Sequence, residues 1–275
     1  MSSAAFFIIL RKSIDFPHPC HYTNGKIIIG QVNVTDTLHI FKKGFNYSED
    51  GPGNRLVYHL CGCNLRCPWC ANPEGMRLNG KCTAVSVEDL VSEAVSCRMM
   101  FFDGGGVTFT GGEATVQFEA VASALTLLQA AGINTCIETN AAHPRLSELF
   151  GVLDHLICDF KHHDADSFRC MTGGDLAIVK ANITRAASER YVHIRIPLIG
   201  GFNASEKDAD AFAAFFDTLD KSRFDVELLP YHEYGKDKWA SLGLPYTMHD
   251  AFVTADTVRH FTDTFKQHGI RVIST

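Results

Sequence analysis

Short apolar runs alternate with longer amphipathic stretches along this chain, from about residue 55 to the C-terminus. The apolar runs have the length of buried strands, and the stretches between them repeat apolar residues at helical spacing. Strands are predicted at residues 56–60, 106–110, 134–138, 155–160, 192–198, 226–230 and 271–273, the last at the edge of the sheet. Helices are predicted at residues 85–98, 117–131, 144–150, 175–189, 205–219 and 248–268. This alternation indicates βαβ units, so we predict an α/β fold, a partial (β/α)6 TIM-like barrel of parallel strands.

The first forty residues lack this pattern, because Pro17, Pro19 and a polar stretch at residues 22–25 interrupt them. One strand is predicted there, at residues 26–32. We expect residues 1–31 to form an N-terminal extension, either an appendage or partly disordered. Residues 32–275 are predicted to form a single domain, since barrels of roughly 200–250 residues commonly fold as one unit.

Residues suited to chemistry follow most of the predicted strands. A cysteine cluster follows the first strand, and Arg195 lies within the fifth. The others are Gly111, Gly112 and Glu113 after the second strand, Glu138, Thr139 and Asn140 after the third, Asp159 and Lys161 after the fourth, and His232 and Glu233 after the sixth. The carboxyl ends of the strands meet on one face of a parallel barrel and carry its active site. The sequence therefore predicts one site on that face.

Composition and charge narrow the class of protein. The chain is 46% hydrophobic and 20% charged, which excludes a disordered chain. Its formal net charge of −6 gives no general affinity for nucleic acid or anionic lipid. No apolar run reaches the roughly 18 residues of a transmembrane helix, and the start of the chain lacks the pattern of a signal peptide. We expect a cytoplasmic protein with neither a nucleic-acid nor a membrane partner.

Four of the ten cysteines lie in residues 61–70, CGCNLRCPWC. In a cytosolic chain such a cluster indicates metal or redox chemistry before disulfides. Four thiolates could hold a tetrahedral Zn²⁺ ion. Alternatively, Cys63, Cys67 and Cys70, spaced C-x3-C-x2-C, could bind three irons of a [4Fe–4S] cluster and leave the fourth iron free. Zinc ligands usually come in two separated pairs, and Cys61 can simply pack at the end of its strand, so the pattern favours the cluster. No second ligand group is formed by the remaining cysteines, Cys20, Cys82, Cys97, Cys136, Cys158 and Cys170.

The C-x3-C-x2-C spacing, with Trp69 before the last cysteine, resembles the signature of the radical S-adenosylmethionine (radical SAM) superfamily. Further segments resemble those of the glycyl-radical-enzyme activating enzymes, of the pyruvate formate-lyase type in particular. They are residues 50–55 (DGPGNR), 104–114 (GGGVTFTGGEA) and 228–239 (LLPYHEYGKDKW). The likeness extends from about residue 32 to the end of the chain.

This resemblance implies an oxidoreductase that cleaves SAM reductively at a [4Fe–4S] cluster. The resulting 5′-deoxyadenosyl radical would abstract hydrogen from a backbone glycine of a partner, a glycyl radical enzyme, with the turn at residues 50–55 beside the barrel mouth as its dock. Many such activases carry a ferredoxin-like insert after the cysteine loop, and residues 72–85 leave no room for one. The electron is therefore expected from an external donor such as flavodoxin or ferredoxin. The alternatives are a radical SAM enzyme that acts on a small molecule and a zinc-stabilised binding module without catalysis.

The resemblance also implies roles for single residues. Cys63, Cys67 and Cys70 would carry the cluster, and Glu138 with Asp159 would hold a monovalent cation. SAM would be bound by Trp69, Gly111, Gly112, Glu113, Glu138, Thr139, Lys161, Arg195 and His232. For Arg195 the alternative is an ion pair with an acid of the barrel. The chain departs from the family at residues 138–141, which read ETNA where the family has DTNG.

Overall fold

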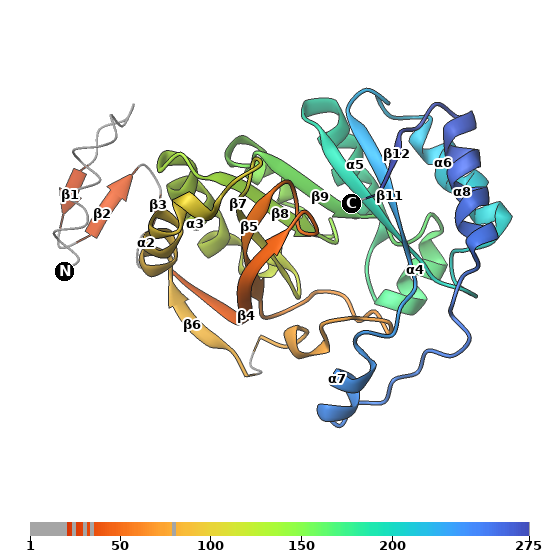
Figure 1. Cartoon of the computed structure of the whole chain (residues 1–275), viewed down its shortest axis with the longest axis horizontal. Helices are drawn as coiled ribbons and strands as arrows, with labels where there is room; N and C mark the ends of the chain where they lie inside the picture. The colour runs from red at the N-terminus through yellow and green to blue at the C-terminus, as the bar shows by residue number, and fades with distance from the viewer. Residues whose placement is uncertain (1–20, 24–25, 30–31, 34–35, 79–80, 275) are drawn as a thin grey trace.

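The computed structural model describes residues 21–23, 26–29, 32–33, 36–78 and 81–274. Its centre is a nine-stranded sheet of order β12-β11-β10-β9-β8-β7-β5-β4-β6. Six consecutive neighbours pair in parallel, and they are β5 (Asn54–Leu60), β7 (Gly106–Gly111), β8 (Asn134–Thr139), β9 (His155–Asp159), β10 (Val192–Leu198) and β11 (Phe224–Pro230). The sheet curves but does not close (Figure 1). The predicted partial barrel is confirmed.

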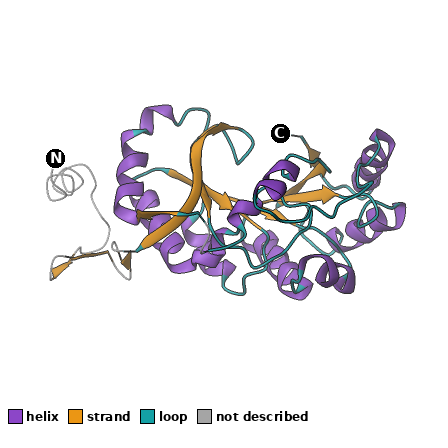
Figure 2. Cartoon of the chain, turned by 90° about the horizontal axis from the view of Figure 1, so that it is seen from below, coloured by secondary structure: helices purple, strands orange, loops and turns teal. Residues whose placement is uncertain are grey.

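Helices flank the outside of the curved sheet, as Figure 2 shows. They are α2 (Val87–Ser96), α3 (Phe118–Ala130), α4 (Ala165–Thr172), α5 (Leu176–Glu189), α6 (Glu206–Phe216) and α8 (Ala255–Gln267). The short helix α7 (Lys236–Ser241) lies away from the sheet, at the bottom of Figure 1. Short 3-10 turns occur at η1 (Pro73–Gly75), η2 (Arg98–Met100), η3 (Ala114–Gln117) and η4 (Leu146–Val152). Five of the α-helices begin at a side chain that accepts a hydrogen bond from the first turn, namely Ser86, Asp164, Asp175, Ser205 and Thr254. Such N-caps each contribute about 1 kcal/mol.

Several elements differ from the sequence-based expectation. The sequence pattern missed β4 (Thr37–Tyr47), which pairs antiparallel with both β5 and β6 (Thr83–Ser86). The long helix expected at residues 248–268 begins only at α8, because Asp250 takes a left-handed φ of 50° and Thr254 caps the helix. The stretch predicted as a helix at residues 144–150 is the 3-10 turn η4.

The predicted strand at residues 26–32 is two strands, β2 (Lys26–Ile29) and β3 (Val32–Asn33). With β1 (His21–Thr23) they form a separate three-stranded sheet, while β12 (Val272–Ile273) extends the main sheet in parallel beside β11. The expectation for the rest of residues 1–31 lies outside the described residues. In the part of the chain that the structure describes, no helix has the length and apolar character to cross a membrane.

Candidate functional site

The carboxyl ends of the parallel strands surround a cavity of about 240 Å³. The cysteine loop after β5 lines it, together with the ends of β7, β8, β9, β10 and β11 and the loops that follow them. The predicted residues that line it are Cys63, Cys67, Trp69, Cys70, Gly111, Gly112, Glu113, Glu138, Thr139, Asp159, Lys161 and His232. One cavity therefore brings together the predicted site residues except Arg195 and Glu233.

Backbone N–H groups of the cysteine loop point at its own sulfurs. The Leu65 N–H donates to Cys63 Sγ at 3.4 Å, and the Asn72 N–H donates to Cys70 Sγ at the same distance. Such bonds stabilise thiolate ligands and hold them in place. The loop thus carries the donors that a metal–thiolate site requires.

Burial raises the pKa of all three thiols, to about 11 for Cys63, to about 12 for Cys67, and in the same direction for Cys70. In the metal-free protein the thiols therefore carry protons at neutral pH. Because only thiolates are metal ligands, binding of a metal has to release these protons.

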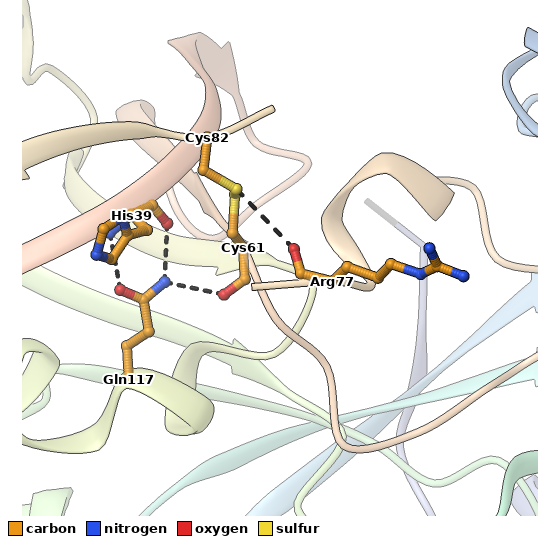
Figure 3. Close-up of a disulfide and its surroundings, with 5 residues drawn as sticks. All are labelled: His39, Cys61, Arg77, Cys82 and Gln117. Atoms are coloured by element: carbon orange, nitrogen blue, oxygen red, sulfur yellow. Dashed lines mark hydrogen bonds between the residues drawn. A yellow bond between two sulfur atoms is a disulfide. The ribbon is translucent and has the colours of Figure 1, made fainter. Parts of the chain in front are cut away.

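The fourth cysteine of the cluster, Cys61, forms a disulfide with Cys82 (Figure 3). We expected Cys61 simply to pack and gave Cys82 no role, and both expectations are wrong. Cys61 is fully buried, but its position at the end of β5 also faces the segment that leads into β6. The Gln117 side chain bonds the backbone of Cys61 and of His39 on the neighbouring strand. Cys61 is consequently not available as a fourth thiolate.

The spacing of the three remaining thiols also disfavours a single ion. Around one zinc the sulfurs would lie roughly 3.8 Å apart, because each Zn–S bond measures about 2.3 Å. Among the described residues the three cysteines do not form a group whose ligand atoms all lie within 4.8 Å of one another. Each cysteine of a [4Fe–4S] cluster bonds a different iron, so wider spacing suits the cluster. The residues present fit a three-cysteine cluster better than zinc.

His162, His163 and Asp208 do lie this close together, because their potential ligand atoms are all within 4.8 Å of one another. His162 Nδ1 accepts from the Asp164 N–H, and its Nε2 lies 2.9 Å from the Phe202 carbonyl, to which it donates. Both nitrogens of this imidazole therefore already have partners. The group is a structural hydrogen-bond cluster.

The disulfide gives a testable effect on stability. It joins residues 21 positions apart, and closing a loop of that length contributes about 3 kcal/mol by restricting the unfolded chain. We expect Cys82→Ser to lower the unfolding free energy of the oxidised apo-protein by this amount in urea titrations. A reductant should lower wild type to the same level, while Cys170→Ser, at an exposed free cysteine, should change nothing. Equal stability of wild type with and without reductant would contradict the pairing.

The glycine pair at the end of β7, Gly111 and Gly112, lets the backbone there approach the backbone at the end of β5 and in the cysteine loop closely. A Cβ on Gly112 would lie 2.2 Å from the Gly62 carbonyl oxygen, and one on Gly111, whose φ is 111°, would lie 2.4 Å from Leu60 N. The Gly112 N–H donates to Leu60 O, and the Glu113 N–H donates to Gly62 O, both at 2.8 Å. We expected these glycines to bind SAM. The close approach in the structure is to the cysteine loop itself.

Glu113 is buried and joins the loops after β7 and β8. One carboxylate oxygen accepts from the Thr115 and Thr139 hydroxyls at 2.6 Å, and the other accepts from the Asn140 N–H at 2.7 Å. The Asn140 side chain continues to Asn64 in the cysteine loop, at 2.7 Å. Ala141, where the family has glycine, takes a φ of 56°, a conformation that costs a non-glycine residue about 1 kcal/mol.

The two carboxylates predicted to hold a cation each have a cationic side chain beside them. Lys161 Nζ lies 2.6 Å from Asp159, and Arg195 Nη1 lies 2.8 Å from Glu138. Burial opposes protonation of Lys161, but the charges of Asp159 and Cys67 outweigh it and raise its pKa. Lys161 therefore presents a fixed positive charge to the cavity.

Aromatic rings form another part of the lining. Trp69 is buried and its ring contacts Phe202 at a centroid distance of 5.0 Å. His232 stacks on Tyr234 at 4.0 Å, and burial lowers its pKa, so its imidazole is neutral at pH 7. A flat, partly apolar surface beside charged groups suits a nucleoside.

Arg195 lies outside this cavity. Its guanidinium donates to Glu227 and Glu138, both at 2.8 Å, and to the Glu49 carbonyl. The protein itself thus supplies the partners of this buried charge, which is the ion-pair arrangement that we named as the alternative.

The turn at residues 50–55 also lies elsewhere than expected. It leads into the first residues of β5, whereas the cysteine loop follows the last, so the length of the seven-residue strand separates them by roughly 20 Å. Gly51 and Pro52 line a second cavity, of about 410 Å³, together with Arg195 and the amino-terminal residues of β9 and β10. Our expectation that the turn sits beside the cysteine-loop mouth is wrong, because it belongs to the opposite end of the barrel.

Sequence reasoning assigned no role to Asn72, Lys238 and Trp239, which contact the end of the cysteine loop. Lys238 and Trp239 are the last two residues of the segment 228–239 that carries the resemblance. The motif therefore contained them but did not indicate what they contact. Their contacts join residues more than 160 positions apart.

Comparison with known proteins agrees with the three-cysteine cluster that the geometry of the site favours. A family profile described as the Radical SAM superfamily matches residues 57–213, more than half of the chain. The chain is 33% identical over 209 residues to a pyruvate formate-lyase-activating enzyme of Staphylococcus epidermidis, covering 72% of this chain and 83% of the relative. It is 31% identical over 267 residues to the Streptococcus mutans enzyme of that name, covering 89% and 96%.

Solved structures agree in fold. A domain of a pyruvate-formate lyase-activating enzyme from Bacteroides vulgatus is similar with a TM-score of 0.51 and 27% identity, covering 62% of this chain and 98% of that domain. A radical SAM methyltransferase from Sphaerobacter thermophilus has a TM-score of 0.61 at 15% identity, covering 99% and 81%. At that identity the likeness concerns the fold alone.

Proposed function

This chain belongs to the radical SAM superfamily and, within it, to the family of the pyruvate formate-lyase-activating enzymes, and from this premise we propose that it activates a glycyl radical enzyme. Members of the superfamily use a [4Fe–4S] cluster and SAM. When bound, the reduced cluster would supply one electron to the sulfonium of SAM, and this chemistry would provide the 5′-deoxyadenosyl radical that takes a hydrogen atom from the glycine Cα of the partner. The observation that carries the proposal is one cavity lined by three free thiols, with the fourth cysteine tied in a disulfide.

The proposal assigns tasks to several side chains of the cavity. Cys63, Cys67 and Cys70 would bind three irons, and the positive charge of Lys161 would attract the methionine carboxylate. Trp69 and His232 would face the nucleoside part of SAM, where the neutral imidazole can donate one hydrogen bond.

Glu113 and Thr139 would act on SAM indirectly. Their hydrogen bonds fix the loops after β7 and β8 against the cysteine loop, so the distance between cluster and SAM would not vary. Gly111 and Gly112 contribute the close packing that this arrangement needs. A monovalent cation between Glu138 and Asp159 stays a prediction, and it would share these carboxylates with Arg195 and Lys161.

The partner is proposed to be pyruvate formate-lyase or a related glycyl radical enzyme, and the electron to come from flavodoxin or ferredoxin. Abstraction requires the glycine Cα in near contact with the radical carbon, because positioning makes the reaction selective. Docking of the glycine loop on the turn at residues 50–55 would require entry through the second cavity, at the amino-terminal ends of the strands.

The test is anaerobic reconstitution followed by reaction with a purified glycyl radical enzyme. We expect about four irons and four sulfides per chain, 5′-deoxyadenosine formed on reduction in the presence of SAM, and a glycyl doublet in the partner by electron paramagnetic resonance. Cleavage of SAM with no radical in any glycyl radical enzyme would favour a small-molecule substrate. One zinc per chain and no cleavage would support the binding module instead.

A further inference from the structure

The short helix α7 packs against the last cysteine of the loop. Gly235, just before this helix, allows the approach, since a Cβ there would lie 2.4 Å from the Cys70 carbonyl oxygen. One turn later the Trp239 Nε1–H donates to that same carbonyl at 2.9 Å. The helix therefore fixes the peptide group between Cys70 and Ala71.

Lys238 contacts the residues that follow. Its Nζ donates to the Ala71 carbonyl at 2.9 Å and to Asn72 Oδ1 at 3.0 Å, and it forms an ion pair with Glu74 at 3.0 Å. Asn72 is the residue whose backbone N–H donates to Cys70 Sγ. Lys238 thus holds a sulfur-directed donor in place, and its positive charge offsets the negative charge of Glu74 near Cys70.

We propose that Lys238 and Trp239 are positioning residues that set the reduction potential of the cluster through Cys70. The inference rests on the proposed function, because it needs a cluster at Cys63, Cys67 and Cys70. Hydrogen bonds to cluster sulfurs and nearby positive charge stabilise the reduced state, which carries one more negative charge. Both effects raise the potential and so make the cluster easier to reduce by a cellular donor.

The charge is tested with Lys238→Met, Lys238→Arg and a matched control, Lys236→Met. Lys236 lies on the same helix but pairs with Glu233 at 2.7 Å rather than with the loop. We expect the midpoint potential of the reconstituted cluster, from an anaerobic dye titration, to fall in Lys238→Met, to be largely restored in Lys238→Arg, and to stay at the wild-type value in Lys236→Met. The fall should be larger at low ionic strength, because Lys238 is partly exposed and salt screens it.

The hydrogen bond is tested with Trp239→Phe, which keeps a smaller aromatic ring beside Tyr246 and removes the N–H donor. We expect altered g-values of the reduced cluster and about 10-fold faster loss of iron to a chelator, the usual cost of removing an outer partner of a metal ligand. Unchanged potential in Lys238→Met, together with unchanged spectrum and iron retention in Trp239→Phe, would overturn the inference. A wild-type chain that takes up no iron and sulfide would overturn the proposed function instead, so the two failures are distinct.

Discussion

Replacement of Cys67 by Ser is expected to reduce SAM cleavage by far more than 100-fold. Cys67 is buried in the cavity wall between the other two cysteines of the loop. Loss of an outer partner of a metal ligand already costs about 10- to 100-fold, and Cys67→Ser replaces a ligand itself with a harder, less acidic hydroxyl. The measurement is the yield of 5′-deoxyadenosine after reduction, with iron content determined on the same sample.

The matched control is Cys170→Ser, at an exposed free cysteine in α4 outside the cavity, which should keep full iron content and activity. Thermal unfolding of the two apo-proteins should agree within about 2 °C, which would separate loss of the ligand from loss of the fold. A Cys67→Ser chain that still assembles a cluster and cleaves SAM at the wild-type rate would refute the assignment of the three ligands.

The parallel strands were predictable because each is buried on both faces and reads as an apolar run. The burial of Leu56, Val107 and Ile137 inside the sheet illustrates this. Strand β4 was missed because its second half lies at the surface, with Lys42 and Lys43 exposed, so hydrophobicity alone does not mark it. Its hydrogen bonds to β5 and β6 are contacts between distant segments, which a local pattern does not record.

In the site, too, local features could be predicted from the sequence and contacts between distant segments could not. The spacing of Cys63, Cys67 and Cys70 is local and visible in the sequence. The disulfide partner of Cys61 was not visible in the sequence. Cys82 lies 21 residues further along the chain, and it comes close to Cys61 because the strand after it, β6, pairs with β4. The sequence placed Arg195 within its strand, but the acids that pair with it come from two other strands, 57 and 32 residues away.

Replacement of Arg55 by Met is expected to lower the free energy of unfolding by about 3–5 kcal/mol, a large part of the 5–15 kcal/mol typical of a domain. Arg55 is fully buried, and burial lowers the pKa of its guanidinium. Its guanidinium donates to Thr108 Oγ1 at 2.6 Å, to Val107 O at 2.9 Å and to Asn134 Oδ1 at 3.0 Å. Methionine would fill the space but leave these acceptors without a donor, and each buried orphan costs about 1–3 kcal/mol.

Urea unfolding of the apo-protein measures this loss, with Arg185→Met as the control. Arg185 is exposed and pairs with Glu189 one turn along its helix, so its removal should cost under about 0.5 kcal/mol. Because Arg55 lies at the opposite end of β5 from the cysteine loop, folded Arg55→Met should still cleave SAM at the wild-type rate per molecule. Suppose instead that Arg55→Met is as stable as wild type and cleaves SAM, yet produces no radical in the partner. Arg55 would then serve recognition of the glycine loop, and the structural role derived from its buried hydrogen bonds would be wrong.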